Sequence, residues 1–163
     1  MRLSAASVKA WRSICQSLVL LPGLTSISIE DTDLHAVALH DWALGRRLAS
    51  LSLSNCSMTR VPPAACNLPN LRSLFLSGLP LTGLDSGSYL TNLHCMMIQC
   101  DGHTSGSEVL CKAEHLQRVI VICESHDASK QVCFCRAQLQ GFVPSSCTLV
   151  IFGKEAGFGL VRC

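Results

Sequence analysis

Apolar residues recur along the chain in a fixed order: apolar, two others, apolar, one other, apolar. The first members of five such copies lie 24, 23, 22 and 23 residues apart. The copies are Leu24, Ile27 and Ile29; Leu48, Leu51 and Leu53; Leu71, Leu74 and Leu76; Leu93, Met96 and Ile98; and Leu116, Val119 and Val121. With 48% hydrophobic residues, fifteen matches would arise by chance roughly once in 10⁵. The pattern predicts five short strands whose last two apolar residues face a common core.

A further small or apolar residue precedes each copy by three or four positions, at Leu21, Leu44, Leu68, Leu90 and Ala113. The phrases LPGLTSISI and LPNLRSLFL make the kinship between copies visible. The third copy with its lead-in, MTRVPPAACNLPNLRSLFLSGLPL over 58–81, resembles the leucine-rich repeat family, and the resemblance covers about residues 17–123. It implies an α/β fold, a curved horseshoe-shaped solenoid with a parallel sheet on the concave face and helical or irregular convex returns.

One position departs from the family pattern. The family usually places Asn three residues after the last strand leucine, where its amide satisfies backbone groups in the turn. This chain has Thr32, Cys56, Leu79, Asp101 and Glu124 there. The Leu79 side chain cannot hydrogen-bond, so we expect the turn of the third unit to find another partner for its backbone groups.

The pattern predicts a single domain over residues 1–163, with five repeats over 21–123. Residues 1–20 are expected to form a partial first unit or a convex helix, because Leu3, Trp11 and Leu18 follow a helical spacing. Residues 124–163 are expected to hold a degenerate sixth repeat and a C-terminal cap. In that segment 130–139 would be a return helix, VPSSCTLVIF a strand with Leu149 and Ile151 inward, and the end a hairpin. We see no dedicated N-terminal cap, which fits a part of a longer array.

Charge and cysteine content limit the classes of partner and compartment. The 13 basic and 11 acidic residues form no long run of either sign, which argues against nucleic acid as a partner. No apolar run has the length of a membrane span. Eleven cysteines at irregular spacings are more typical of buried thiols than of a disulfide framework, which favours an intracellular, cytoplasmic protein. Mitochondrial import is the alternative, because the first 29 residues carry Arg2, Lys9 and Arg12 and no acid.

No motif for catalysis or cofactor binding is present: the chain lacks a phosphate loop, a nucleophile elbow, a zinc protease helix and a dinucleotide fingerprint. Two clusters contain residues with chemical potential, but core packing explains both of them better. The first combines Cys133 and Cys135 with Cys123 and His126, without the paired spacing of zinc sites. The second is Cys111 with His115, a thiol and a base without a third group. We therefore expect no metal, no cofactor and no enzymatic activity.

The residues between the inward strand positions predict a binding surface. One outward column reads Ser28, Ser52, Phe75, Met97 and Ile120, and the next reads Glu30, Ser54, Ser77, Gln99 and Ile122. The face is polar at its N-terminal end and apolar at its C-terminal end, and exposed apolar patches usually mark binding sites. The predicted partner-binding residues are Phe75, Met97, Ile120 and Ile122, with a polar rim of Arg72, His94, Gln99 and Arg118. The alternative is that the segment after Ser125 folds over this patch.

The sequence thus predicts a non-catalytic module that binds a partner protein through the concave face of the repeats. One alternative is a structural subunit of a larger assembly, with both faces covered. Another is the substrate-recognition arm of a ubiquitin ligase, although VKAWRSICQSL is only faintly similar to the end of a ligase-recruiting motif. Because fold alone does not determine function, the identity of the partner stays open.

Overall fold

The computed structural model describes residues 2–4, 14, 17–18, 20–32, 47–61, 63–100, 106–123, 139, 141–153 and 161–162. Within these residues the chain forms an eight-stranded sheet whose strands follow one another in chain order. The strands are β1 (Arg2–Ser4), β2 (Ser26–Glu30), β3 (Ser50–Ser54), β4 (Ser73–Ser77), β5 (Cys95–Cys100), β6 (Arg118–Cys123), β7 (Thr148–Gly153) and β8 (Val161–Arg162). The helical segments are α2 (Pro63–Cys66), η3 (Ser88–Leu90) and η4 (Ser107–Lys112).

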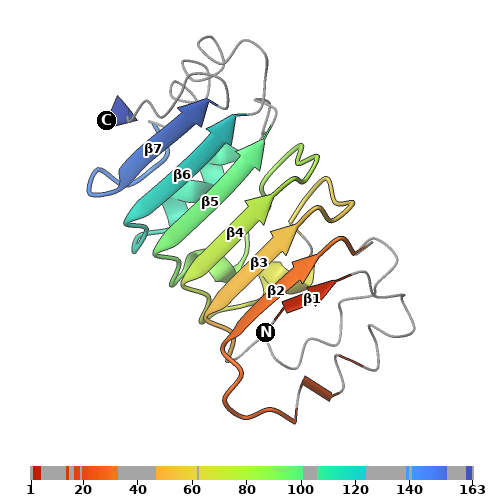
Figure 1. Ribbon diagram of the computed structural model, residues 1–163. Helices are drawn as coiled ribbons and strands as arrows, with labels where there is room; N and C mark the ends of the chain where they lie inside the picture. The colour runs from red at the N-terminus through yellow and green to blue at the C-terminus, as the bar shows by residue number, and fades with distance from the viewer. Residues whose placement is uncertain are drawn as a thin grey trace.

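The sheet is parallel from β1 to β7, and β8 adds an antiparallel edge. Parallel neighbours require a crossover connection, and the short segments α2, η3 and η4 lie in three of these connections, on the side of the sheet away from the viewer in Figure 1. The fold is therefore a parallel sheet with little helix, in agreement with the α/β class that the sequence predicts. None of the helices in the described ranges is long and apolar enough to cross a membrane.

The predicted inward phase of the strands is confirmed. Of the fifteen apolar template positions, fourteen are buried, and only Leu24 is partly exposed. Hydrogen-bonded register places Leu51 beside Leu74, Leu74 beside Met96, and Met96 beside Val119, so the inward side chains form continuous rows. Burial of each large aliphatic side chain contributes about 1.5–3 kcal/mol, which makes these rows the main source of stability.

A tight turn leads into several of the strands. In each case the backbone N–H of the first template residue donates to the carbonyl of the lead-in residue three positions earlier. The bonds are Leu24 to Leu21 (3.2 Å), Leu71 to Leu68 (3.1 Å), Leu93 to Leu90 (3.4 Å) and Leu116 to Ala113 (3.0 Å). The lead-in side chains of Leu68, Leu90 and Ala113 are buried. The lead-in residue of the first copy, Leu21, is 47% exposed, and the buried leucine before that copy is Leu18.

The strands leave the sheet through turns that need a left-handed backbone. Asp31, Asn55 and Gly78 follow β2, β3 and β4 directly and have φ of 49°, 51° and 59°. Asp, Asn and Gly are the residues that adopt this conformation at lowest cost. The turns also bond to each other, because Asn55 Nδ2 donates to Asp31 Oδ1 at 3.2 Å. The sequence thus provides a suitable residue at each of these three turns.

The turn after β4 satisfies its backbone without a polar side chain. Thr32 Oγ1 donates to the Glu30 carbonyl at 2.9 Å, and the Cys56 thiol donates to the Ser54 carbonyl at 3.4 Å. At the corresponding place Leu79 is buried in the core, and the equivalent carbonyl, that of Ser77, accepts the backbone N–H of Asn55 at 2.9 Å. The partner of this turn is therefore a backbone group of the neighbouring turn. The last two positions of this series, 101 and 124, lie outside the described residues.

The first strand corrects the sequence prediction at the N-terminus. Leu3, assigned above to a helical spacing, lies in β1 with its Cα opposite that of Ile29. The short β1 supplies hydrogen-bond partners to an edge of β2 that would otherwise be open, which outweighs a weak helical pattern. Leu18 is buried as expected, and Trp11 lies outside the described residues.

At the C-terminal end the predicted sixth strand is confirmed as β7, with Leu149 and Ile151 buried. The predicted hairpin is confirmed in its pairing, since Ile151 and Val161 are opposite each other in the antiparallel β7–β8 ladder. Of the expected return helix over 130–139, only Leu139 is described, and it is buried.

Candidate binding surface

One face of the sheet is turned away from the core, and we call it the open face. Alternation in the strands puts every second side chain on it, and the burial pattern of β2, β3 and β4 alternates accordingly between buried and partly exposed. The hydrogen-bonded register aligns these outward residues into rows that run across the strands. The middle row consists of Ser28, Ser52, Phe75, Met97, Ile120 and Val150, all partly exposed.

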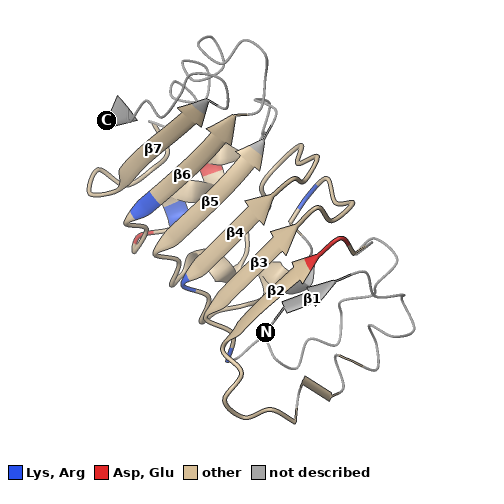
Figure 2. Ribbon diagram, in the orientation of Figure 1, with Lys and Arg blue, Asp and Glu red and all other residues tan. Residues whose placement is uncertain are grey.

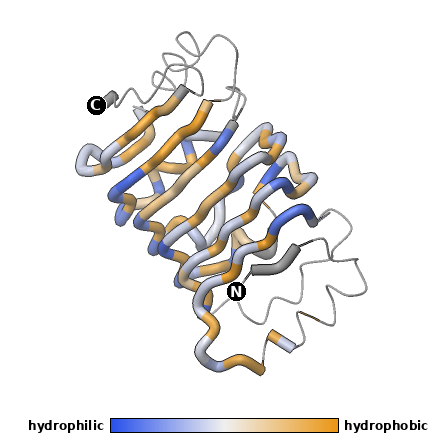
Figure 3. The backbone as a smooth tube through the Cα atoms, in the orientation of Figure 1, coloured by the Kyte–Doolittle hydropathy of each residue, from blue (hydrophilic) through white to orange (hydrophobic). Residues whose placement is uncertain are grey.

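An apolar patch occupies the C-terminal part of the open face. Its members are Phe75, Met97, Ile120, Ile122, Val150 and Phe152. The four residues predicted from the sequence are brought together, because Phe75 is opposite Met97, Met97 is opposite Ile120, and Ile122 lies two positions along β6. The structure adds Val150 and Phe152 from β7, which face the same way because Leu149 and Ile151 face the core. Figure 3 shows the apolar character concentrated in β6 and β7.

Small hydroxyl side chains cover the N-terminal part of the open face. The serine half consists of Ser26, Ser28, Ser50, Ser52, Ser54, Ser73 and Ser77. At its border with the apolar patch, the Ser77 hydroxyl donates to Gln99 Oε1. Gln99, predicted to lie on the polar rim, therefore joins β4 to β5 beside the patch. Serine hydroxyls can donate and accept, so this half can satisfy a polar partner surface, and Glu30 at the end of β2 adds one carboxylate to it.

The edge where the strands begin carries the predicted basic rim. Arg72 and Arg118 are exposed, and the backbone N–H of His94 donates to the Arg72 carbonyl at 2.8 Å, which confirms that the two residues are neighbours. In Figure 2 the ribbon is coloured for basic residues at the starts of β4 and β6. His94 is not a solitary rim residue: its ring stacks on that of His115 with centroids 6.0 Å apart and planes 21° apart. This stack was not predicted from the sequence, because it joins two separate strand-entry turns.

No protein-family model and no curated protein matches the chain.

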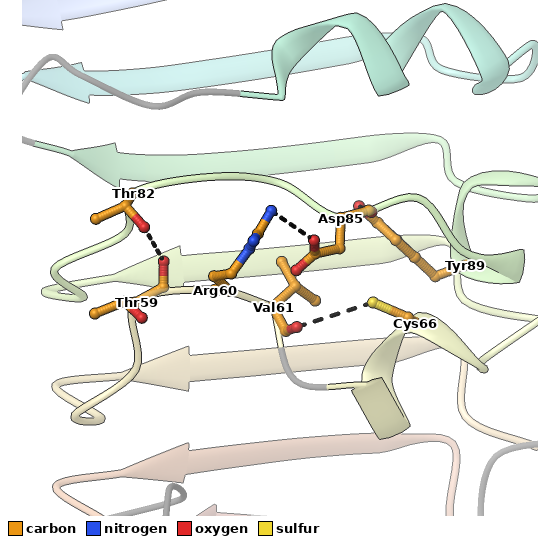
Figure 4. A network of polar contacts seen from close by, with 7 residues as sticks. All are labelled: Thr59, Arg60, Val61, Cys66, Thr82, Asp85 and Tyr89. Carbon is orange, nitrogen blue, oxygen red and sulfur yellow. Dashed lines mark hydrogen bonds and ion pairs between the residues drawn. The ribbon is translucent and has the colours of Figure 1, made fainter.

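The back of the sheet holds a polar network that links consecutive connections (Figure 4). Arg60 and Asp85 form an ion pair at 2.8 Å, and the Tyr89 hydroxyl donates to the Asp85 carbonyl at 2.7 Å. Thr82 donates to the Thr59 carbonyl through both its backbone N–H and its hydroxyl, at 2.8 Å and 3.1 Å. These contacts hold the connection after β3 against the connection after β4.

A buried thiol and phenol beside this network are poorly suited to chemistry. Burial, and secondarily the charge of Asp85, raises the pKa of the Cys66 thiol to about 11. Burial also raises the pKa of Tyr89, with smaller contributions from Cys66 and Asp85. Both groups are therefore neutral at physiological pH, and a neutral thiol is a weak nucleophile. Their arrangement suits packing and support of the connections.

Of the two candidate clusters from the sequence, the thiol and base pair is not brought together, and the zinc candidate lies mostly outside the described residues. The Cys111 thiol donates to the Glu108 carbonyl at 2.8 Å, while His115 stacks on His94. Of the zinc candidates only Cys123 is described, and it is buried; Cys133, Cys135 and His126 lie outside the described residues. Across the described ranges there is no group of three or more His, Cys, Asp or Glu side chains placed to hold a metal ion.

Proposed function

We propose that the chain is a solenoid of the leucine-rich repeat type and that it binds a partner protein, without catalysis, through the open face of its sheet. The observation that carries the proposal is the apolar patch, in which six large apolar side chains from β4 to β7 adjoin on the face opposite the core. Large apolar side chains gathered on one surface gain free energy when a partner removes them from water.

The surroundings of the patch resemble the anatomy of a protein interface. Such interfaces have an apolar centre containing aromatic residues and methionine, enclosed by a polar rim. Here Phe75 and Met97 lie in the middle row, with Gln99 on one side and Arg118 on the other. In this arrangement Phe75 and Met97 are the anchors, and the rim residues set orientation. The cytoplasmic location expected from the cysteines belongs to the same proposal.

The test compares two double variants in affinity purification from the native source, followed by titration against the purified partner. Replacing Phe75 and Met97 by Ser is expected to weaken binding by roughly thirtyfold or more, because interface anchors lose about 2 kcal/mol or more on truncation. Melting should stay near that of the unmodified protein, because both residues are outside the core.

The matched control replaces two exposed residues of η4, Glu108 and Lys112, by Ser, which changes two side chains and leaves the net charge unaltered. This control is expected to bind normally. Loss of the partner in the η4 variant together with retention in the Phe75 and Met97 variant would contradict the proposal. Lys9 and Arg12, which the sequence suggests as a control pair, lie outside the described residues.

A further inference from the structure

We propose that the apolar patch receives an amphipathic α-helix of the partner, laid across strands β4 to β7, with acidic residues along the flank that faces Arg72 and Arg118. This inference rests on the proposed function and specifies the partner's chemistry. It follows from three properties of the open face: the spacing of the middle row, the width of the patch and the charge of the rim.

The spacing of the middle row matches a helix better than an extended chain. Phe75, Met97, Ile120 and Val150 occupy consecutive strands in register, so neighbours are about 4.8 Å apart and the row is about 14 Å long. A helix presents one apolar ridge residue per turn of about 5.4 Å, so three turns overshoot the row by roughly 2 Å. An extended chain presents same-side residues about 6.7 Å apart, so three such intervals exceed the length of the row by roughly 6 Å, which is more than the spacing between two strands.

The width of the patch matches the apolar stripe of an amphipathic helix. At β4 and β5 the middle row is bordered by Ser73 and Cys95 on one side and by the bonded pair of Ser77 and Gln99 on the other. The patch is therefore a single side chain wide at that end. At β6 and β7 it widens to two rows, because Ile122 is opposite Phe152. A narrow apolar strip with polar borders suits the roughly 100° apolar stripe of a surface helix rather than a broad apolar sheet.

The rim beside this strip is basic. Arg72 and Arg118 are exposed on the side where the strands begin, and His94 lies between them. Of the described carboxylates, Glu30 is on the open face of β2, two strands away from β4, and Glu114 is exposed at the rim itself, in the turn that precedes β6. Arg72 and Arg118 together outweigh the charge of Glu114, so this part of the rim is net positive. Acidic residues on the facing flank of a bound helix would complement this rim, fix its orientation and speed association. The spacing of the middle row, the width of the patch and the charge of the rim together favour an acidic amphipathic helix as the ligand.

The experiment measures the binding of three fluorescein-labelled peptides to the full chain by fluorescence anisotropy. Two of the peptides are hydrocarbon-stapled and one is linear. The first peptide is a stapled helix with Leu at positions i, i+4, i+7 and i+11 and Glu along one flank. The second is linear and has the same amino-acid composition with Leu at every second position. The third is the stapled helix with Lys replacing the flank Glu residues. We expect the first to bind at least tenfold more tightly than either of the others, and its affinity to fall with added salt.

Two variants of the protein localise the interaction. Met97→Ser is expected to reduce binding of the first peptide at least tenfold, and Arg118→Gln is expected to reduce its preference over the third peptide. Absence of binding by the first peptide, equal or tighter binding by the second, or indifference to the flank charge would each overturn the inference. If the natural partner still depends on Phe75 and Met97 in those cases, the open face remains the binding surface and only the helix is wrong. If the natural partner is indifferent to both residues, the proposed function fails.

Discussion

Replacing two adjacent residues of β4, Leu74 and Phe75, by Ala should separate the two faces of the sheet. Leu74 is fully buried between Leu51 and Met96, whereas Phe75 is partly exposed beside Met97. A buried Leu→Ala substitution costs about 2–5 kcal/mol, through lost burial and the cavity left behind. Phe75→Ala loses mainly one large cross-strand contact, that with Met97, worth roughly 0.2–1 kcal/mol, because its other cross-strand partner is the small Ser52.

The difference is large enough to measure by thermal unfolding and by urea unfolding, each followed by circular dichroism. For a chain of 163 residues, each kcal/mol shifts the melting temperature by about 2–4 °C. We therefore expect Leu74→Ala to melt roughly 4–20 °C lower and Phe75→Ala to stay within about 4 °C of the unmodified protein. Similar losses of unfolding free energy from the two substitutions, with the same slope of that free energy against urea concentration, would refute the assignment of Phe75 to the open face.

Three further predictions concern close packing, a buried thiol and cysteine pairing. Gly106 has φ of 78°, and an added Cβ would lie 2.3 Å from the Leu84 carbonyl oxygen, so Gly106→Ala should lower the free energy of unfolding by about 1–3 kcal/mol. The control Gly141→Ala, whose added Cβ would have no atom within 4 Å, should change it little, and equal effects of the two substitutions in urea titrations would contradict this. Folding raises the pKa of Cys66 from its ordinary value of 9.0 to about 11, so the stability it contributes is complete below pH 9 and is lost as pH rises toward 11. Unfolding titrations between pH 8 and 11 should show a shallower decline for Cys66→Ala, and an unchanged decline would count against the burial of this thiol. No disulfide joins any of the six cysteines whose side chains are described, and we expect mass spectrometry without reductant to recover no specific bridged peptide from the native protein; one such peptide would overturn the expectation.

The strands could be predicted from the sequence because their signal is local and repeated. In SLSLS and SLFLS each alternate leucine must face the core, and the same alternation fixes Ser52 and Phe75 on the other face. The register between strands follows from the shared order of apolar positions within the copies, since a shift of one residue would expose every buried leucine. The strand at Leu149 and Ile151 was predictable for the same reason.

The remaining features depend on contacts between segments that have no shared periodicity. β1 is three residues long, which is too short for an alternating pattern to be recognised in the sequence. It forms because its backbone pairs with that of β2. Two contacts join neighbouring connections: the stack of His94 on His115 and the ion pair of Arg60 with Asp85. No local sequence pattern predicts either contact. Val150 and Phe152 were readable as outward residues of the predicted sixth strand, but the patch acquired them only when β7 was paired with β6.

The central claim is that the open face contacts the partner, and site-specific photocrosslinking tests it most directly. A photoreactive benzoylphenylalanine is placed either at Met97, in the middle row of the open face, or at Glu108, exposed on η4 behind the sheet. After irradiation of the native complex, we predict a covalent adduct with the partner from position 97 and none from position 108. An adduct from position 108 without one from position 97 would place the binding surface on the connections and contradict the account.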